Sequence, residues 1–222
     1  MAAYRFEIEL FLSHFREQAA SIAKVVMPFH RKVLYAAAFD PLARAAYGTV
    51  GSHRDRFVRL IRELAKWSDA DNVSLPQLQL RLREAKRYRY RLYRETSRRL
   101  DTWNRGMPNP LSQSPKLPEL ISFATTSEHI HLKEAQYVHL LYTYRNNLLH
   151  EFREPGYGTD WSGTSKEPFY GSSIYGPWEL VLPGIFFATL YEHALQGLEA
   201  HLLQEKINPY DQFQFGSLWR RK

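Results

Sequence analysis

Residues 142–152 read Tyr-Thr-Tyr-Arg-Asn-Asn-Leu-Leu-His-Glu-Phe, with Arg145 followed directly by Asn146 and, five positions after the arginine, by His150. On an α-helix Asn146 and His150 lie one above the other on the same face, because residues four apart are neighbours. Arg145 lies roughly 140° away round the helix, but its long side chain can reach back toward that face. An imidazole that exchanges protons near neutral pH, a planar guanidinium and an amide together form a set of groups that can act on a phosphodiester.

The helix that carries these residues is expected to run from about Ser127 to Phe152. Its apolar spacing predicts one buried side and one polar side. A polar side on a well-packed helix needs solvent, a partner or a ligand, so the polar side is the expected site. A purely structural alternative is also open, in which Arg145 pairs with a nearby carboxylate and His150 caps the end of its helix. The expected buried side is Tyr137, Leu141, Tyr144, Leu148 and Phe152, and the expected polar side is His139, Thr143, Asn146 and His150.

The composition excludes several classes of protein. The 222 residues are 44% apolar and 24% charged and contain no cysteine, so neither a disulfide framework nor a thiolate site is possible. The chain has no His-Glu-x-x-His motif, no Walker lysine after a glycine run, no Gly-x-Ser-x-Gly motif, and only one Glu-x-x-His where a di-iron bundle needs two. No run has the length of a membrane span, and charges lie at Arg5, Glu7 and Glu9, where a signal peptide would be apolar. We therefore expect a cytoplasmic protein without membrane contact, cofactor or metal.

The positive charge is concentrated in one stretch. The chain has a formal charge of +7, and between Arg81 and Arg105 ten basic residues face three acidic ones. Ser74 and Gln77 resemble a capping box that opens a basic helix over about 76–104. Tyrosines alternate with the cations there, as in a surface that contacts phosphates and bases, although a solvated helix face or an acidic protein partner would explain the charge as well. The residues expected to bind RNA are Arg87, Tyr90, Arg91, Arg94 and Arg98.

The whole chain is expected to be a single all-α domain, a bundle of about five or six helices. Pro28 should break an N-terminal helix over 4–37, Asp40-Pro41 should start a short helix that Gly48 ends, and Ser52 should open a longer one. The expected divisions are N-terminal helices over 1–105 that include the basic helix, a Pro-rich crossing loop over 106–118, a motif helix, long loop and last helix over 119–204, and an aromatic and basic tail over 205–222. The loop over 155–178 is rich in glycine and tyrosine and is long enough to contain a short hairpin. Because it follows His150, it is expected to form a wall or lid of the site. Pro183-Gly184 should open the last helix.

The pattern of Arg145, Asn146 and His150 on a late helix resembles the Arg-x4-6-His motif of the HEPN superfamily. The resemblance covers the motif closely and the surrounding helical layout loosely. It implies a HEPN-like fold and a metal-independent endoribonuclease, in which the catalytic residues are Arg145, Asn146 and His150 and RNA is cleaved by attack of the 2′-hydroxyl. It also implies a homodimer with the motif helices facing each other.

Some HEPN proteins are toxins or phage-defence effectors, so an antitoxin protein is a further partner that the resemblance implies. In the toxin branch that pairs with a nucleotidyltransferase, a tyrosine commonly lies two residues after the histidine, but here that residue is Phe152, which has no hydroxyl to modify. HEPN-like domains also serve as non-catalytic dimeric modules that bind RNA or nucleotides, and this is the alternative function.

Overall fold

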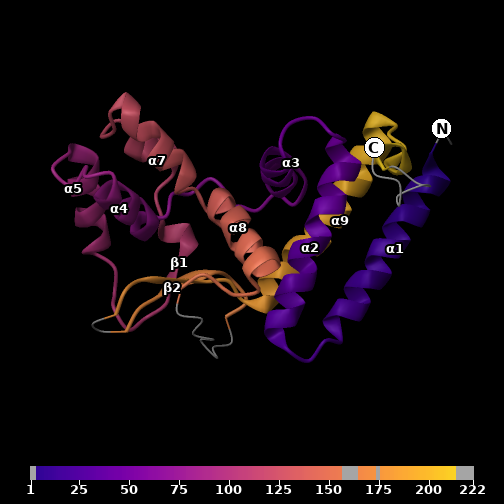
Figure 1. Cartoon of the computed structure of the whole chain (residues 1–222), viewed down its shortest axis with the longest axis horizontal. Helices are drawn as coiled ribbons and strands as arrows, with labels where there is room; N and C mark the ends of the chain where they lie inside the picture. Colours follow the sequence, from indigo (N-terminus) through magenta and orange to yellow (C-terminus); the bar gives the residue numbers. More distant parts are fainter. Residues whose placement is uncertain (1–3, 157–164, 174–175, 214–222) are drawn as a thin grey trace. The chain divides into compact units, whose positions relative to one another are not determined.

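The computed structural model of the chain describes residues 4–156, 165–173 and 176–213 and is mostly helical (Figure 1). The helical fold class predicted from the sequence is therefore confirmed in its coarse form, with a small three-stranded sheet added. The chain divides into two compact units: unit 1 comprises residues 1–67 and 187–222, and unit 2 comprises residues 68–186. The Pro-rich segment 106–118, which we expected to separate two helical halves, lies inside unit 2.

Unit 1 is built from long helices. Pro28 is the first residue of a helix, as its missing N–H favours, and the preceding helix ends at Ala23. The expected new start at Asp40-Pro41 is wrong, because Pro41 lies inside a continuous helix that ends at Tyr47 and is capped by Gly48. The helices of unit 1 are α1 (Arg5–Ala23), α2 (Pro28–Tyr47), α3 (His53–Arg59), the π-helical turn η1 (Leu60–Leu64), α9 (Gly184–Glu205, whose first turn belongs to unit 2) and the 3₁₀ turn η5 (Pro209–Gln212).

Aromatic side chains form the core of unit 1. The ring of Tyr191 on α9 lies 5.5 Å from that of Tyr35 and 5.6 Å from that of Phe39, both on α2. Gly197 lets α9 approach η1 closely, because a Cβ at this position would lie 2.2 Å from the carbonyl oxygen of Leu64. Leu190, Ala194, Leu198 and Leu202 of α9 are all buried.

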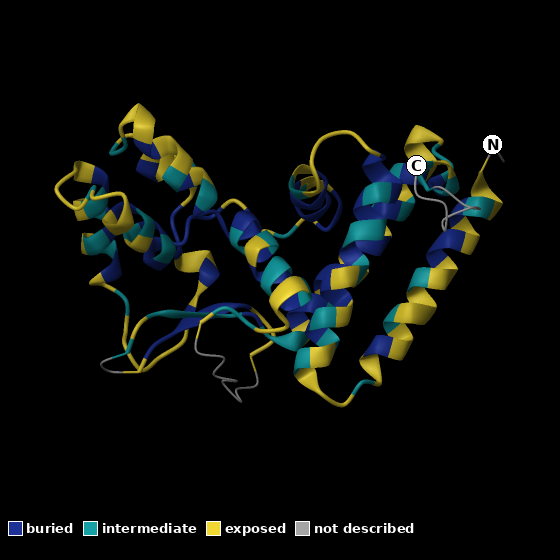
Figure 2. Ribbon diagram, in the orientation of Figure 1, coloured by how far each residue is buried: buried dark blue, intermediate teal, exposed yellow. Residues whose placement is uncertain are grey.

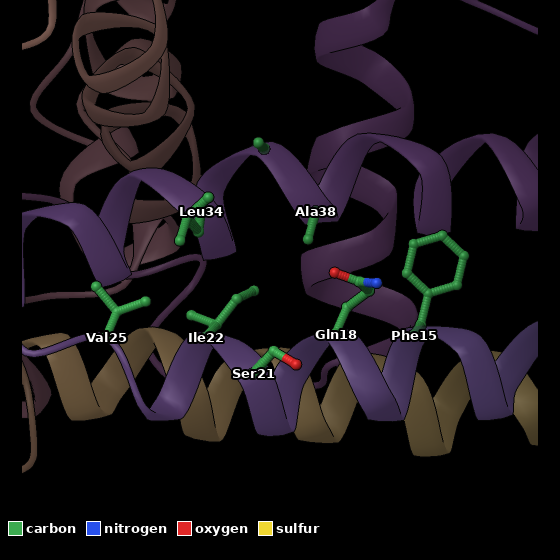
Figure 3. Close-up of a pocket in the computed structure, with 8 residues that line it drawn as sticks. Phe15, Gln18, Ser21, Ile22, Val25, Leu34 and Ala38 are labelled. Carbon is green, nitrogen blue, oxygen red and sulfur yellow. The ribbon is translucent and has the colours of Figure 1, made fainter.

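A cavity of about 380 Å³ lies between α1 and α2 (Figure 3). Small alanines on α2 face larger side chains on α1, and no titratable side chain lines the space. The residues that line this cavity therefore include no acid, base or charged group that could act in catalysis. Its lining residues are Phe15, Gln18, Ser21, Ile22, Val25, Leu34, Ala37 and Ala38.

Unit 2 combines short helices with the sheet. The strands pair in the order β1-β2-β3, all antiparallel, and the Pro-rich segment supplies β1 and short helical turns instead of a plain loop. Strand β2 falls within the long loop expected over 155–178, and β3 begins directly after it, at Glu179. The elements are α4 (Leu75–Glu84), α5 (Arg91–Leu100), β1 (Asn109–Pro110), the 3₁₀ turns η2 (Leu111–Gln113) and η3 (Thr126–Glu128), α6 (Leu117–Ile121), α7 (His129–Glu134), α8 (Tyr137–Asn146), the π-helical turn η4 (Asn147–Glu151), β2 (Phe169–Gly171) and β3 (Glu179–Val181).

The core of unit 2 joins the helices to the sheet. Leucines from α4, α5, α6 and α7 form one buried cluster. Two buried tyrosines are fixed by their hydroxyl groups: Tyr170 of β2 lies 2.7 Å from the hydroxyl of Ser74, and Tyr137 of α8 lies 2.6 Å from that of Ser114. Burial raises the pKa of both tyrosines, so both stay neutral and hydrogen-bonded.

The predicted basic helix over 76–104 is two helices, α4 and α5. Ser74 caps α4 as expected, with its hydroxyl accepting from the N–H of Gln77. Lys86 then adopts a left-handed conformation with φ of 57°, and the N–H of Arg87 donates to the carbonyl of Leu82 at 2.7 Å, which closes the helix end. The chain turns back, and α4 and α5 form a helical hairpin.

The predicted motif helix is also interrupted. A short extended segment over 72–74 pairs with the chain between α7 and α8: the N–H of Ser74 donates to the carbonyl of Ala135, and the N–H of Tyr137 donates to the carbonyl of Asn72. These bonds take backbone groups that a continuous helix would use, so α8 starts anew at Tyr137.

No helix among the described residues is long and apolar enough to span a bilayer.

Candidate functional site

Arg145 is the buried member of the motif. It lies in the last turn of α8 and is 8% exposed, although its side chain carries a permanent charge. Its guanidinium donates a hydrogen bond of 2.8 Å to the amide oxygen of the half-buried Asn146 and lies 6.0 Å from the ring centre of Tyr142. The amide therefore holds one edge of the guanidinium fork in a fixed orientation.

His150 lies in the π-helical turn η4 and is exposed. In a π-helical turn the backbone bonds join residues five apart, and each residue advances by a smaller angle than in an α-helix. Relative to the regular helix expected from the sequence, this wider turn brings His150 round toward the side of Arg145. The motif thus combines a solvent-exposed imidazole with a mostly buried cation.

The chain beyond His150 is fixed by several contacts. Phe152 ends the π-helical turn in a left-handed conformation with φ of 52°. The buried Tyr144 of α8 donates its hydroxyl hydrogen bond to the carboxylate of Glu154, and Arg153 pairs with Glu151 at 2.5 Å. The contact between Tyr144 and Glu154 ties the segment after the motif back to α8, and no pattern in the sequence predicts it.

The expected two-sided pattern of the motif helix is correct in part. Tyr137, Leu141, Tyr144 and Leu148 are buried as expected. Phe152 is 63% exposed, because the helix has already ended, and His139 is only 6% exposed, because it lies on a buried side of α8 instead of the polar side. Among the predicted polar residues Thr143 and His150 are exposed, and Asn146 is half-buried.

The expected wall or lid over 155–178 is described only in part. Residues 157–164 and 174–175 lie outside the described residues. Of the remainder, β2 is buried against the core of unit 2 through Phe169 and Tyr170. This part of the loop is therefore a packed element of the unit.

The residues predicted to bind RNA lie on the α4–α5 hairpin and differ in their surroundings. Tyr90, Arg91 and Arg94 are exposed, and Arg91 lies over the ring of Phe123 at 4.7 Å. Arg87 is half-buried and lies over the ring of Tyr90 at 4.8 Å.

Arg98 differs from the other candidates because it is occupied by a carboxylate. Its guanidinium donates two hydrogen bonds to Glu95, at 2.7 and 2.8 Å. The hydrogen bonds from Arg98 and Arg99 lower the pKa of Glu95 to about 2. Glu95 is thus ionised throughout the physiological range, and Arg98 is the least available of the predicted phosphate-binding cations.

No group of three or more histidine and carboxylate side chains within residues 4–156, 165–173 and 176–213 is placed to hold a metal ion. Of the predicted catalytic residues, Arg145 and Asn146 are joined by a hydrogen bond, and His150 follows them in the next turn of the chain. Comparison of the chain with protein-family models, curated proteins and solved structures gave no match.

Proposed function

We propose that the chain is a HEPN-like, metal-independent endoribonuclease whose catalytic residues are Arg145 and His150, with Asn146 as the residue that positions Arg145. The observation that carries the proposal is that a guanidinium, held at 2.8 Å by the neighbouring amide, is followed one turn later by an exposed imidazole. An arginine fork is suited to the oxygens of a phosphate, and an exposed imidazole is suited to proton transfer near neutral pH.

In the proposed reaction the imidazole of His150 removes the proton from a ribose 2′-hydroxyl. The 2′-oxygen forms a bond to phosphorus, the bond from phosphorus to the 5′-oxygen breaks, and the leaving 5′-oxygen takes a proton from a second imidazole. Arg145 stabilises the charge on the phosphoryl oxygens. The products are a 2′,3′-cyclic phosphate and a 5′-hydroxyl.

The second imidazole is proposed to come from another copy of the chain, with the two motif helices facing each other across a composite site. Each copy then contributes one cation and one proton-transfer group. A single motif would offer only the base or only the acid at any one time.

The test is an RNA cleavage assay in excess EDTA that compares the wild type with His150→Ala and Arg145→Lys. Loss of proton transfer should lower the rate roughly 10²- to 10⁴-fold, and loss of the guanidinium fork roughly 10²- to 10³-fold. Lysine at position 145 keeps the buried charge, which limits damage to folding. The exposed His193 of α9 gives a matched control, since His193→Ala should cleave like the wild type.

A substrate with 2′-deoxyribose at the cleaved position should survive. Cleavage that is unchanged in His150→Ala and Arg145→Lys would refute the proposed site. Absence of cleavage over a broad set of RNAs, with RNA binding intact, would favour the second candidate, a non-catalytic binding module. The exposed cations of the α4–α5 hairpin support binding in either case.

A further inference from the structure

Residues 83–94, here called the α4–α5 tip, form the most strongly charged exposed turn of unit 2. They include six basic residues and one acidic residue, Glu84. Most of the turn between the two helices is exposed (Figure 2). Within the described part of the chain, Arg83, Lys86 and Arg94 form no ion pair. These cations are therefore available to an anionic partner.

The α4–α5 tip also exposes two aromatic rings. Tyr88 is 49% exposed and Tyr90 is 40% exposed, although large aromatic side chains usually bury most of their surface. Each ring lies beside a guanidinium: Arg89 is 5.8 Å from the ring centre of Tyr88, and Arg87 is 4.8 Å from that of Tyr90. Tyr93, which follows them in the same pattern, packs against the core cluster and is not part of this surface.

We propose that the α4–α5 tip binds single-stranded nucleic acid, with its cations on the phosphates and with Tyr88 and Tyr90 stacked on bases. Rings and guanidinium planes that alternate with free cations match the way proteins hold single strands without reading their sequence. The identification of the strand as RNA substrate rests on the proposed function; binding itself does not require cleavage.

The exposed rings favour a single strand over other polyanions. In a duplex the bases are already stacked on one another, so Tyr88 and Tyr90 would have no free base face to contact. An acidic protein would pair with the cations but would leave the rings with nothing to stack on. A single strand is the polyanion that uses both kinds of group.

The α4–α5 tip is separate from the Arg145–His150 motif. Figure 1 draws α5 and the C-terminal end of α8 in different parts of unit 2. A strand held at the tip is therefore bound away from the bond that is cut, and the tip acts as an accessory site.

The experiment measures the binding of the full-length wild type to a fluorescent single-stranded DNA and to a duplex of the same sequence. DNA lacks the 2′-hydroxyl, so binding is observed without the proposed cleavage reaction. We expect tighter binding of the single strand. The double variant Tyr88→Ala/Tyr90→Ala should bind the single strand at least fivefold more weakly, because each stacked base contributes roughly five- to 100-fold, and should bind the duplex as the wild type does.

Two controls separate the roles of the rings and the cations. Tyr88→Phe/Tyr90→Phe keeps the rings and should bind like the wild type. Arg94→Gln should lower the slope of log affinity against log salt by roughly 0.7 for a single strand, whereas Arg98→Gln should change it less, because Arg98 is paired with Glu95.

Equal affinity for single strand and duplex, with no effect of the alanine variants, would overturn the proposal and leave a purely electrostatic surface. Binding of polyglutamate as tight as that of the single strand would overturn it in favour of an acidic protein partner. Failure of the proposed nuclease function would give a different result. No cleavage would be seen in EDTA, while the binding that depends on Tyr88 and Tyr90 would persist. Conversely, cleavage that depends on His150 but binding that ignores Tyr88 and Tyr90 would reject the accessory site alone.

Discussion

Asn146 both provides a hydrogen-bond acceptor for the buried Arg145 and orients its guanidinium. Its amide oxygen accepts the 2.8 Å hydrogen bond from Arg145, whose side chain is almost entirely buried. A buried cation needs hydrogen-bond acceptors, because burial without them is costly. The same bond orients the guanidinium, so Asn146 acts as a positioning residue in the proposed reaction.

We expect Asn146→Ala to lower the cleavage rate about 10- to 100-fold, the effect of losing one hydrogen bond to a charged group. Asn146→Asp keeps an acceptor for Arg145 and should unfold near the wild-type temperature, but its carboxylate would offset the positive charge and keep cleavage low. The control is Asn147→Ala, because Asn147 is half-buried like Asn146 but no side-chain hydrogen bond joins it to Arg145. Cleavage at the wild-type rate by Asn146→Ala would contradict the positioning role.

Some helix starts in this chain follow local rules and were predicted from the sequence. Ser52 opens α3 as expected, in a capping box with Asp55, and Ser74 caps α4. The break at Pro28 was predicted, but other interruptions were missed, because they depend on contacts that no local pattern reveals. The break between α7 and α8 requires pairing with residues 72–74, and the π-helical turn at His150 has no counterpart in the spacing of apolar residues.

Candidate site residues could be identified from their chemical type, but how far each is buried could not be predicted from the sequence. Arg145 and His150 were identified from the sequence, whereas their opposite exposure depends on how unit 2 packs round α8. His139 shows the same limit: its spacing matched the polar side, but it is buried. Tertiary packing decides such cases, since the helical period alone leaves the width of the buried face open.

The α4–α5 hairpin depends on Lys86, whose φ of 57° costs a residue with a Cβ about 1 kcal/mol. Lys86→Gly should therefore be more stable than Lys86→Ala by up to ~1 kcal/mol in the free energy of unfolding, although the greater freedom of glycine in the unfolded chain reduces the gain. Both variants lose the same charge, so their difference isolates the backbone. Urea unfolding followed by circular dichroism measures it, and a more stable alanine variant would show that the left-handed turn is not retained in solution.

The division into two units separates the long helices of α1, α2 and α9 from the elements that carry the proposed chemistry. Unit 2 alone contains the Arg145–His150 motif and the α4–α5 tip, and it lies between the two parts of unit 1 along the chain. The proposed reaction needs one group that accepts a proton and another that donates one. The motif of one chain offers a single imidazole, so it cannot supply both groups at the same time.

We expect cleavage to require a dimer of the chain. The rate per chain should fall on dilution, over the same concentrations at which sedimentation shows dissociation into monomers. With RNA in large excess, added His150→Ala protein should lower the rate per wild-type chain, because wild-type chains exchange into pairs with one imidazole. An equal amount of an unrelated protein controls for crowding. A constant rate per chain at concentrations where only monomer sediments would show that one copy suffices, and the second proton-transfer group would then have to be found within the same chain.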